Sequence, residues 1–371
     1  MNLRNTILSA LVFAAMTAFA AVPEYVNVNA NKIESNGADW TALRNKVART
    51  MKGDTADIRI LHIGDSHIQA EFVTNHLRGL LQKRYGNAGR GLISPLRLAG
   101  TNQPHDYAVT AQGGGDWTQT RLLKYPWPVK PGMTGISARP SESATVVWKP
   151  LLDGHKIKHA AFLTSEGLKT AEYPTLQDSV TLSVAPGTSI YGAILDNGKK
   201  GLLYSAIGNN GACFNDYSLI DNFANRTHVF NPDLIILSMG TNEGFSTMTD
   251  EQIARSVDDL VTTLRDYNPD AAMLILLPME SQKNRNHGHK PLSPYYDINK
   301  RVAEAKDIIN ARAKALGVPV WDFYTISGGQ GASDKWLADK LMNKDRIHLL
   351  KPGYELMGEL LYDALVPALE N

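Results

Sequence analysis

Three residues of this chain have the types and local contexts that acyl transfer requires: a serine, a histidine and an aspartate. Ser66 follows the apolar run Ile58–Ile63, and Gly64 and Asp65 provide a turn between them. Asp65 or Ser66 can cap a helix after this turn, so we expect the serine at the carboxyl end of a strand. The first amides of that helix would lie beside the hydroxyl and could stabilise an oxyanion. Ser66 is therefore a candidate nucleophile that needs a base.

Asp345 and His348 are the candidates for the base and for the group that orients it. They lie three positions apart, just before the last predicted helix, and this spacing places both side chains on one side of a turn. Asp345 can accept a hydrogen bond from one ring nitrogen of His348, which leaves the other nitrogen to deprotonate a serine. One loop thus supplies both groups, and the fold must bring Ser66 to it.

Two further segments have the small and amide residues that suit an oxyanion hole. Acyl transfer places negative charge on a carbonyl oxygen in the transition state, and hydrogen-bond donors aimed at that oxygen stabilise it. The backbone N–H of Gly211 and the side-chain amide of Asn242 are suitable donors, and the backbone N–H of Ser66 would be a third. Gly208 is an alternative to Gly211.

Several nearby residues have both a functional and a structural interpretation. Trp117 could stack on a sugar ring, although aromatic residues in β-rich segments usually belong to the core. His67 could contact a substrate or support the start of the helix, and Glu243 could support a loop or be solvated. Cys213 is most simply a small buried side chain. Because it is the single cysteine of the chain, an internal disulfide is excluded.

Neither a metal nor an organic cofactor is expected. His287 and His289 resemble a metal-binding pair, but no cysteine or carboxylate lies beside them at ligand spacing, so a surface loop is favoured. The Gly113–Gly115 run lacks the strand and helix that flank a dinucleotide-binding motif, which argues against nucleotide binding.

The candidate residues lie among strands and helices that alternate along the chain. Apolar runs predict strands at 58–63, 233–240, 272–277 and 318–323. Apolar residues at helical spacing predict helices near 40–51, 72–81, 249–264, 298–309 and 353–369, with a capping box at Thr249 and Gln252. This alternation predicts an α/β fold with a parallel sheet covered on both faces.

Residues 100–203 interrupt this pattern. They contain short alternating runs separated by Pro, Gly and Asn, which is typical of a small β-sandwich or curled sheet. We therefore predict a discontinuous α/β domain at 21–99 and 204–371, with a β-rich domain inserted at 100–203.

The first 20 residues have the features of a secretory signal peptide. Arg4 precedes an apolar segment that ends in Ala18-Phe19-Ala20, and this segment is too short to span a membrane. We expect an exported protein without a membrane span. The whole chain has 38 Lys and Arg against 37 Asp and Glu. Arg4 is the one charged residue of the predicted signal peptide, so cleavage would leave 37 basic and 37 acidic residues. The resulting neutral balance argues against nucleic acid or an anionic membrane as the main partner.

The motifs, taken in order, resemble the four blocks of the SGNH (GDSL) hydrolase superfamily. The matching residues are Gly64-Asp65-Ser66, Gly211, Gly240-x-Asn242 and Asp345-x-x-His348. The resemblance covers about 50–95 and 204–369 and implies a three-layer α/β/α flavodoxin-like fold with a Ser-His-Asp esterase mechanism. It implies that Ser66 is the nucleophile, His348 the base and Asp345 its orienting group, with Gly211 and Asn242 completing the oxyanion hole. The sequence departs from the usual pattern at His67, where Leu is common, and at Glu243, where Asp is common.

The long segment between the first two blocks makes the chain resemble one subgroup of this superfamily in particular. Exported enzymes that remove O-acetyl groups from peptidoglycan have a block ending in Gly-Thr-Asn-Glu and an inserted β-sandwich resembling a carbohydrate-binding module. The resemblance therefore implies an exported serine esterase that acts on an acetylated glycan, with peptidoglycan as the first expectation. Deacetylation of a plant-type polysaccharide such as acetylxylan, glycan O-acetyl transfer by the same residues, and a binding module with a vestigial hydrolase are the alternatives. The sequence leaves the oligomeric state open.

Overall fold

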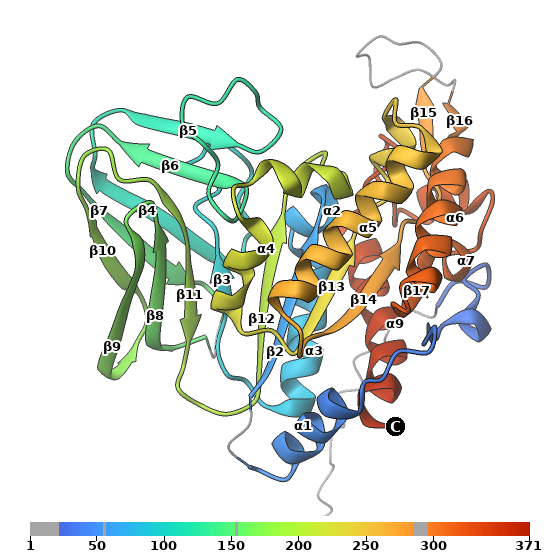
Figure 1. The fold of residues 1–371 in the computed structure, drawn as a ribbon, viewed down its shortest axis with the longest axis horizontal. Helices are drawn as coiled ribbons and strands as arrows, with labels where there is room; N and C mark the ends of the chain where they lie inside the picture. Colours follow the sequence, from blue (N-terminus) through green and yellow to red (C-terminus); the bar gives the residue numbers. More distant parts are fainter. Residues whose placement is uncertain (1–21, 55–56, 153–154, 285–295) are drawn as a thin grey trace, which may run out of the picture.

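The computed structural model describes residues 22–54, 57–152, 155–284 and 296–371. The predicted signal peptide and the pair His287 and His289 lie outside the described residues. Figure 1 shows two parts side by side: an α/β part built from both ends of the chain, and a β-rich part built from the segment between them.

A six-stranded sheet forms the centre of the α/β part. In spatial order its strands are β1 (Ile33–Glu34), β17 (Val320–Asp322), β14 (Ala272–Leu277), β13 (Leu234–Ser238), β2 (Ile58–Gly64) and β12 (Leu202–Gly208). Neighbouring strands are parallel except for the edge strand β1, which is antiparallel to β17. Parallel strands buried on both faces consist of continuous apolar runs, and this explains why these strands could be recognised in the sequence.

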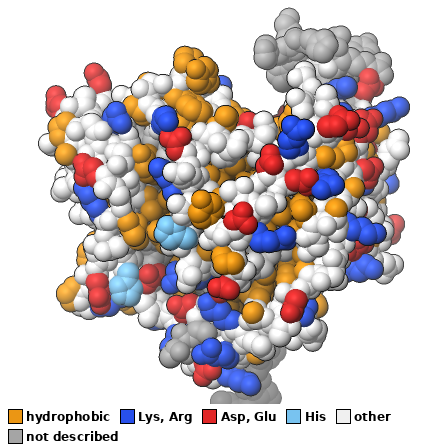
Figure 2. Space-filling model, in the orientation of Figure 1, with side chains coloured by type: hydrophobic (Ala, Val, Ile, Leu, Met, Phe, Trp, Pro, Cys, Tyr) orange, Lys and Arg blue, Asp and Glu red, His pale blue; other side chains and the backbone are white. Residues whose placement is uncertain are grey.

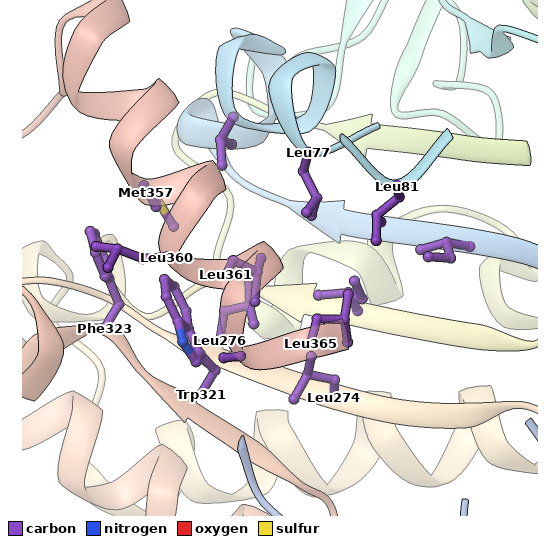
Figure 3. Packing of buried hydrophobic residues seen from close by; sticks show 14 of the residues in the cluster. Leu77, Leu81, Leu274, Leu276, Trp321, Phe323, Met357, Leu360, Leu361 and Leu365 are labelled. Atoms are coloured by element: carbon purple, nitrogen blue, oxygen red, sulfur yellow. The ribbon is translucent and has the colours of Figure 1, made fainter. Parts of the chain in front are cut away.

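Helices cover both faces of the sheet, as predicted. On one face lie α1 (Thr41–Met51), α3 (Phe72–Tyr85) and α9 (Lys351–Glu370), and on the other lie α5 (Asp250–Tyr267) and α6 (Lys300–Ala315). Successive side chains of β2 alternate between the faces, so Ile60 packs with the first group and Leu61 with the second. Figure 3 shows Leu77 of α3 and Leu361 of α9 in the first of these interfaces. The predicted capping box at the start of α5 is present.

The β-rich part consists of two antiparallel sheets that enclose a core of their own. One sheet contains β10 (Val180–Val184), β7 (Ala144–Pro150) and β4 (Tyr107–Gly113). The other contains β5 (Trp117–Arg121), β6 (Ile136–Pro140), β11 (Ile190–Asp196), β8 (Ile157–Thr164) and β9 (Gly167–Gln177), with β3 (Gly91–Ile93) paired to β11. Trp148, Phe162 and Ile190 are buried between them. An inserted β domain is therefore present, and one of its strands, β3, lies before residue 100.

A buried group of charged side chains joins the two parts. Arg90 donates to Asp106 over 2.5 Å and also to Glu71, and Arg78 lies 3.4 Å from Glu71. Buried charges are tolerated only when they are paired in this way. Glu71 has a left-handed backbone (φ 56°) and a buried side chain. For this reason the predicted helix after Ser66 is divided into the short α2 (Ser66–Gln69) and α3.

The remaining elements are short. They are η1 (Val28–Ala30), η2 (Phe214–Leu219), α4 (Phe223–Arg226), η3 (Thr227–Phe230), η4 (Glu243–Phe245), β15 (Gln282–Asn284), β16 (Tyr296–Ile298), α7 (Phe323–Ile326) and α8 (Ala332–Ala338). Among the helices of the described residues, none combines the length and the apolar character needed to cross a membrane. Figure 2 shows basic and acidic side chains interspersed over the visible face, as expected for a nearly neutral chain.

Candidate active site

Ser66 is the first residue of α2, at the carboxyl end of β2. The turn before it requires Gly64, because a Cβ there would lie 2.3 Å from Ile68 Cγ1 and 2.6 Å from the carbonyl oxygen of Ser238. Asp65 then caps α2, since its Oδ1 accepts a hydrogen bond from the backbone N–H of His67 over 2.9 Å. The predicted strand, turn and helix thus place the serine where ligands bind in parallel sheets.

The fold brings Ser66 to the loop that carries Asp345 and His348. Ser66 Oγ lies 2.8 Å from His348 Nε2, and His348 Nδ1 lies 2.8 Å from Asp345 Oδ2. The other carboxylate oxygen of Asp345 accepts from the backbone N–H groups of Ile347 and His348, each over 3.0 Å. The carboxylate is therefore fixed by its own loop and can orient the imidazole, with Nδ1–H donating to it and Nε2 facing the serine hydroxyl.

The electrostatics of this series suit a general base. The hydrogen bond to Asp345 raises the pKa of His348 above its usual value, against the opposing effect of burial. Burial acts to raise the pKa of Asp345, but hydrogen bonds from His348 and Ile347 outweigh it and hold that pKa below its usual value. At neutral pH, Asp345 is therefore a carboxylate, and it lies where it could stabilise a positive charge on His348.

Gly211 and Asn242 line the same cleft as Ser66 and His348, and the cleft has a volume of about 740 Å³. Gly211 has a φ of 84°, a left-handed conformation that favours glycine. Gly208, the alternative, is the last residue of β12, and a Cβ there would lie 2.1 Å from the backbone nitrogen of Gln69. It packs against α2 and is not among the residues lining the cleft. The geometry therefore favours Gly211 as the backbone donor.

The amide of Asn242 is held at the edge of the cleft. Its Nδ2 donates to the carbonyl oxygen of Ala212 over 3.0 Å and has a longer contact, 3.3 Å, with Asp65 Oδ2. The first bond fixes the amide, and the weaker contact leaves one hydrogen that a substrate oxyanion could accept in place of Asp65. Burial raises the pKa of Asp65 to about 7.

Replacement of the Asn242 amide tests this role. We expect Asn242→Ala to lower kcat for ester hydrolysis by about 10²- to 10³-fold, because one donor to the oxyanion is lost, while KM changes much less. The matched control is Asn215→Ala, since Asn215 is an exposed asparagine outside the cleft. Steady-state kinetics on a small acetate ester provide the measurement. A kcat within threefold of wild type would remove Asn242 from the oxyanion hole.

His67 and Glu243, which had two interpretations each, both have structural contacts. The ring of His67 bonds to the hydroxyl of Tyr354 over 2.9 Å, and burial lowers the pKa of His67 to about 3, so the ring is neutral. Glu243 is fully buried and accepts from the backbone N–H of Phe214 over 2.8 Å, which supports the segment after Gly211. Neither side chain lines the cleft.

Cys213 and Trp117 also pack within the protein. Cys213 is buried, and burial raises the pKa of its thiol strongly, so it is no rival to Ser66 as a nucleophile. Trp117 packs against the core of the β-rich part, where a Cβ on Gly114 would lie 2.8 Å from its ring. Trp117 is not among the residues lining the cleft, so the structure does not bring it to Ser66.

Gln69 is a residue that the sequence did not single out. Its Oε1 accepts from the backbone N–H of Asn210 over 2.9 Å, and its Nε2 donates to Thr101 Oγ1 over 3.1 Å. It therefore ties the segment before Gly211 to α2 and to the start of the β-rich segment. No sequence signal identifies it, since its partners lie far away along the chain.

Within the described ranges, no group of three or more His, Cys, Asp or Glu side chains is arranged to hold a metal ion. That the reaction needs no cofactor stays a prediction from the chemistry of the serine, histidine and aspartate.

A family model for the GDSL-like lipase/acylhydrolase family matches residues 178–356. The matched segment includes Gly211, Asn242, Asp345 and His348, whereas Ser66 precedes it. No protein among the curated sequences matches the chain.

The chain is also similar to several solved structures. A structure described as a peptidoglycan O-acetylesterase in action is 25% identical, has a TM-score of 0.73, and covers 91% of this chain and 99% of its own. A lipase/acylhydrolase from Enterococcus faecalis is 17% identical, with a TM-score of 0.34, covering 46% of this chain and 78% of its own. A GDSL-like lipase from Bacteroides thetaiotaomicron is 18% identical, with a TM-score of 0.34, covering 44% of this chain and 76% of its own. The first similarity spans both parts of the molecule, so the predicted fold class with its inserted β domain is confirmed.

Proposed function

We propose that this chain, which is a carboxylic ester hydrolase with the SGNH/GDSL fold, hydrolyses O-acetyl esters on a glycan, with peptidoglycan as the expected polymer. The observation that carries the proposal is the hydrogen-bonded series of Ser66, His348 and Asp345 in an open cleft. Similarity over 91% of the chain to a peptidoglycan O-acetylesterase supports the choice of polymer.

In the proposed reaction, Ser66 Oγ attacks the carbonyl carbon of the acetyl group while its proton passes to His348 Nε2. Asp345 stabilises the resulting imidazolium, and the N–H groups of Gly211, Asn242 and Ser66 stabilise the oxyanion. The bond from the acetyl carbon to the sugar oxygen then breaks, and that oxygen takes the proton from His348. Water attacks the acetyl-serine with His348 again as base, which releases acetate and restores the Ser66 hydroxyl.

Water is the expected acceptor of the acetyl group. The side chains of His348 and Asp345 are 38% and 41% exposed, so water reaches the base directly. A transferase must keep water away from its acyl-enzyme, and this half-exposed arrangement favours hydrolysis over transfer to a sugar hydroxyl.

The predicted signal peptide supports export to the compartment that holds such a polymer. Arg4 and the following apolar segment have the charge and length of a cleaved signal. Export to the periplasm or the medium is part of the proposal.

Acetate release from two polymers tests the function. The mature protein is expected to release acetate from O-acetylated peptidoglycan, and acetylated xylan is the comparison substrate. Release from xylan alone would keep the esterase mechanism but replace the polymer. Glycan binding without turnover of either polymer or of a small acetate ester would replace the proposal with a binding function. An acetate yield that falls when a glycan acceptor is added, with acetylated acceptor formed, would indicate a transferase.

A further inference from the structure

One side of the catalytic cleft is a wall of aromatic rings. Phe72, the first residue of α3, stacks on Tyr354 of α9 with ring centroids 5.9 Å apart and an angle of 19° between the planes. His105 also lies near Phe72, with ring centroids 6.4 Å apart. All three residues line the cleft together with Ser66.

The segment 102–105, which leads into β4, supplies part of this wall. Asn102, Gln103, Pro104 and His105 all line the cleft. The buried ion pair of Arg90 with Asp106, the residue after His105, holds the end of this segment against the α/β part. The cleft is therefore built by both parts of the molecule.

The rest of the cleft is polar but uncharged. Among the described residues that line it, none is Asp, Glu, Lys or Arg. The side chains of Asn102 and Asn210 are exposed and have no hydrogen-bond partner within the described part of the chain. Free amides beside aromatic rings suit a neutral ligand that has apolar C–H faces and also hydroxyl or amide groups.

The cleft is also too large for the acetyl group alone. Its volume of about 740 Å³ falls within the range of roughly 300–1,000 Å³ that holds drug-sized ligands. An acetyl group has only three heavy atoms besides the ester oxygen, so most of the cleft is available to the alcohol that bears it.

We infer that Phe72 and His105 determine specificity: the ring of a neutral acetylated sugar packs against them, while Asn102 and Asn210 hydrogen bond to its hydroxyl or amide groups. This inference rests on the proposed function, because it assigns the cleft to the glycan. The inference also gives the β-rich insertion a role in substrate selection through residues 102–105. This role does not involve Trp117.

The test compares a glycan with an ester that lacks a ring. For each variant, kcat/KM is measured on the acetylated glycan from which the wild type releases acetate and on ethyl acetate. We expect Phe72→Ala and His105→Ala each to lower the ratio of glycan to ethyl acetate activity by about tenfold, which corresponds to about 1.4 kcal/mol. Phe72→Ala removes the packing of Phe72 on Tyr354 and could disturb the structure there. His105 is exposed, so His105→Ala tests the wall without that disturbance.

Tyr267→Ala is the control, since Tyr267 is 50% exposed on α5 and does not line the cleft. Its activity ratio is expected to equal that of the wild type. Equal losses on both substrates, or an unchanged ratio in both wall variants, would overturn the inference and leave the esterase function intact. A wild type that cleaves ethyl acetate but releases acetate from no glycan would overturn the proposed function, and this inference with it.

Discussion

Replacement of Ser66 by alanine is expected to reduce acetate release by on the order of 10⁴- to 10⁶-fold, the range found when a serine nucleophile acting with a base is removed. The physical reason is that, in the part of the chain that the structure describes, Ser66 Oγ is the hydroxyl that contacts His348 Nε2, over 2.8 Å. Cys213 cannot take its place because its thiol is buried and its pKa is raised. The measurement is kcat/KM on a small acetate ester and on the acetylated glycan.

The fold should survive this change. Within the described residues, the Ser66 hydroxyl has a hydrogen bond only to His348, and alanine is a good helix former. We expect the circular dichroism spectrum and the thermal midpoint of Ser66→Ala to match those of wild type closely. Ser218→Ala is the matched control, because this exposed hydroxyl bonds to the carbonyl of Asn215 and does not line the cleft. Folded Ser66→Ala with activity within tenfold of wild type would exclude the serine mechanism.

The strand pattern predicts that Ser66 and Asn242 lie together, whereas the contact of Ser66 with His348, 282 positions away in the chain, is expected only from the resemblance of the motifs to the SGNH hydrolases. Burial on both faces makes β2 and β13 continuous apolar runs, so both strands were visible in the sequence. Carboxyl ends of parallel strands meet at one edge of the sheet, which places the residues after those strands together. The pairing of Asp345 with His348 is local and follows from their spacing.

Other features depend on contacts that no local pattern encodes. The break between α2 and α3 arises because Glu71 turns inward to Arg90, and a buried ion pair across distant segments leaves no periodic signal. Residues 102–105 fall within the predicted β-rich domain, and only the tertiary structure shows that they line the cleft. The same reason explains Trp117: a tryptophan suits a sugar site and a β core equally well, and its packing partners decide which it occupies.

The second large effect is expected from replacement of Asp345, the residue proposed to orient His348. Asp345→Asn is expected to lower kcat by about 10³- to 10⁴-fold, because an amide can donate to Nδ1 of His348 and so place the proton on Nε2. Nε2 could then no longer accept the proton of Ser66. Asp266→Asn is the matched control, since Asp266 is exposed on α5 and is not among the residues that line the cleft. A loss below tenfold in Asp345→Asn would show that the imidazole is oriented without this carboxylate.

The pH profile of the residual activity separates this orienting role from simple damage to the loop. His348 must be neutral to act as a base, so kcat/KM rises with pH as His348 loses its proton. In the wild type this rise is expected to have its midpoint above 6.5, because the hydrogen bond to Asp345 raises the pKa of His348 above that usual value. Loss of the negative charge in Asp345→Asn lowers this pKa, so the midpoint should move to lower pH. An unchanged midpoint with a lower plateau would instead mean that the charge of Asp345 does not act on His348, and that the substitution lowers activity by displacing the loop.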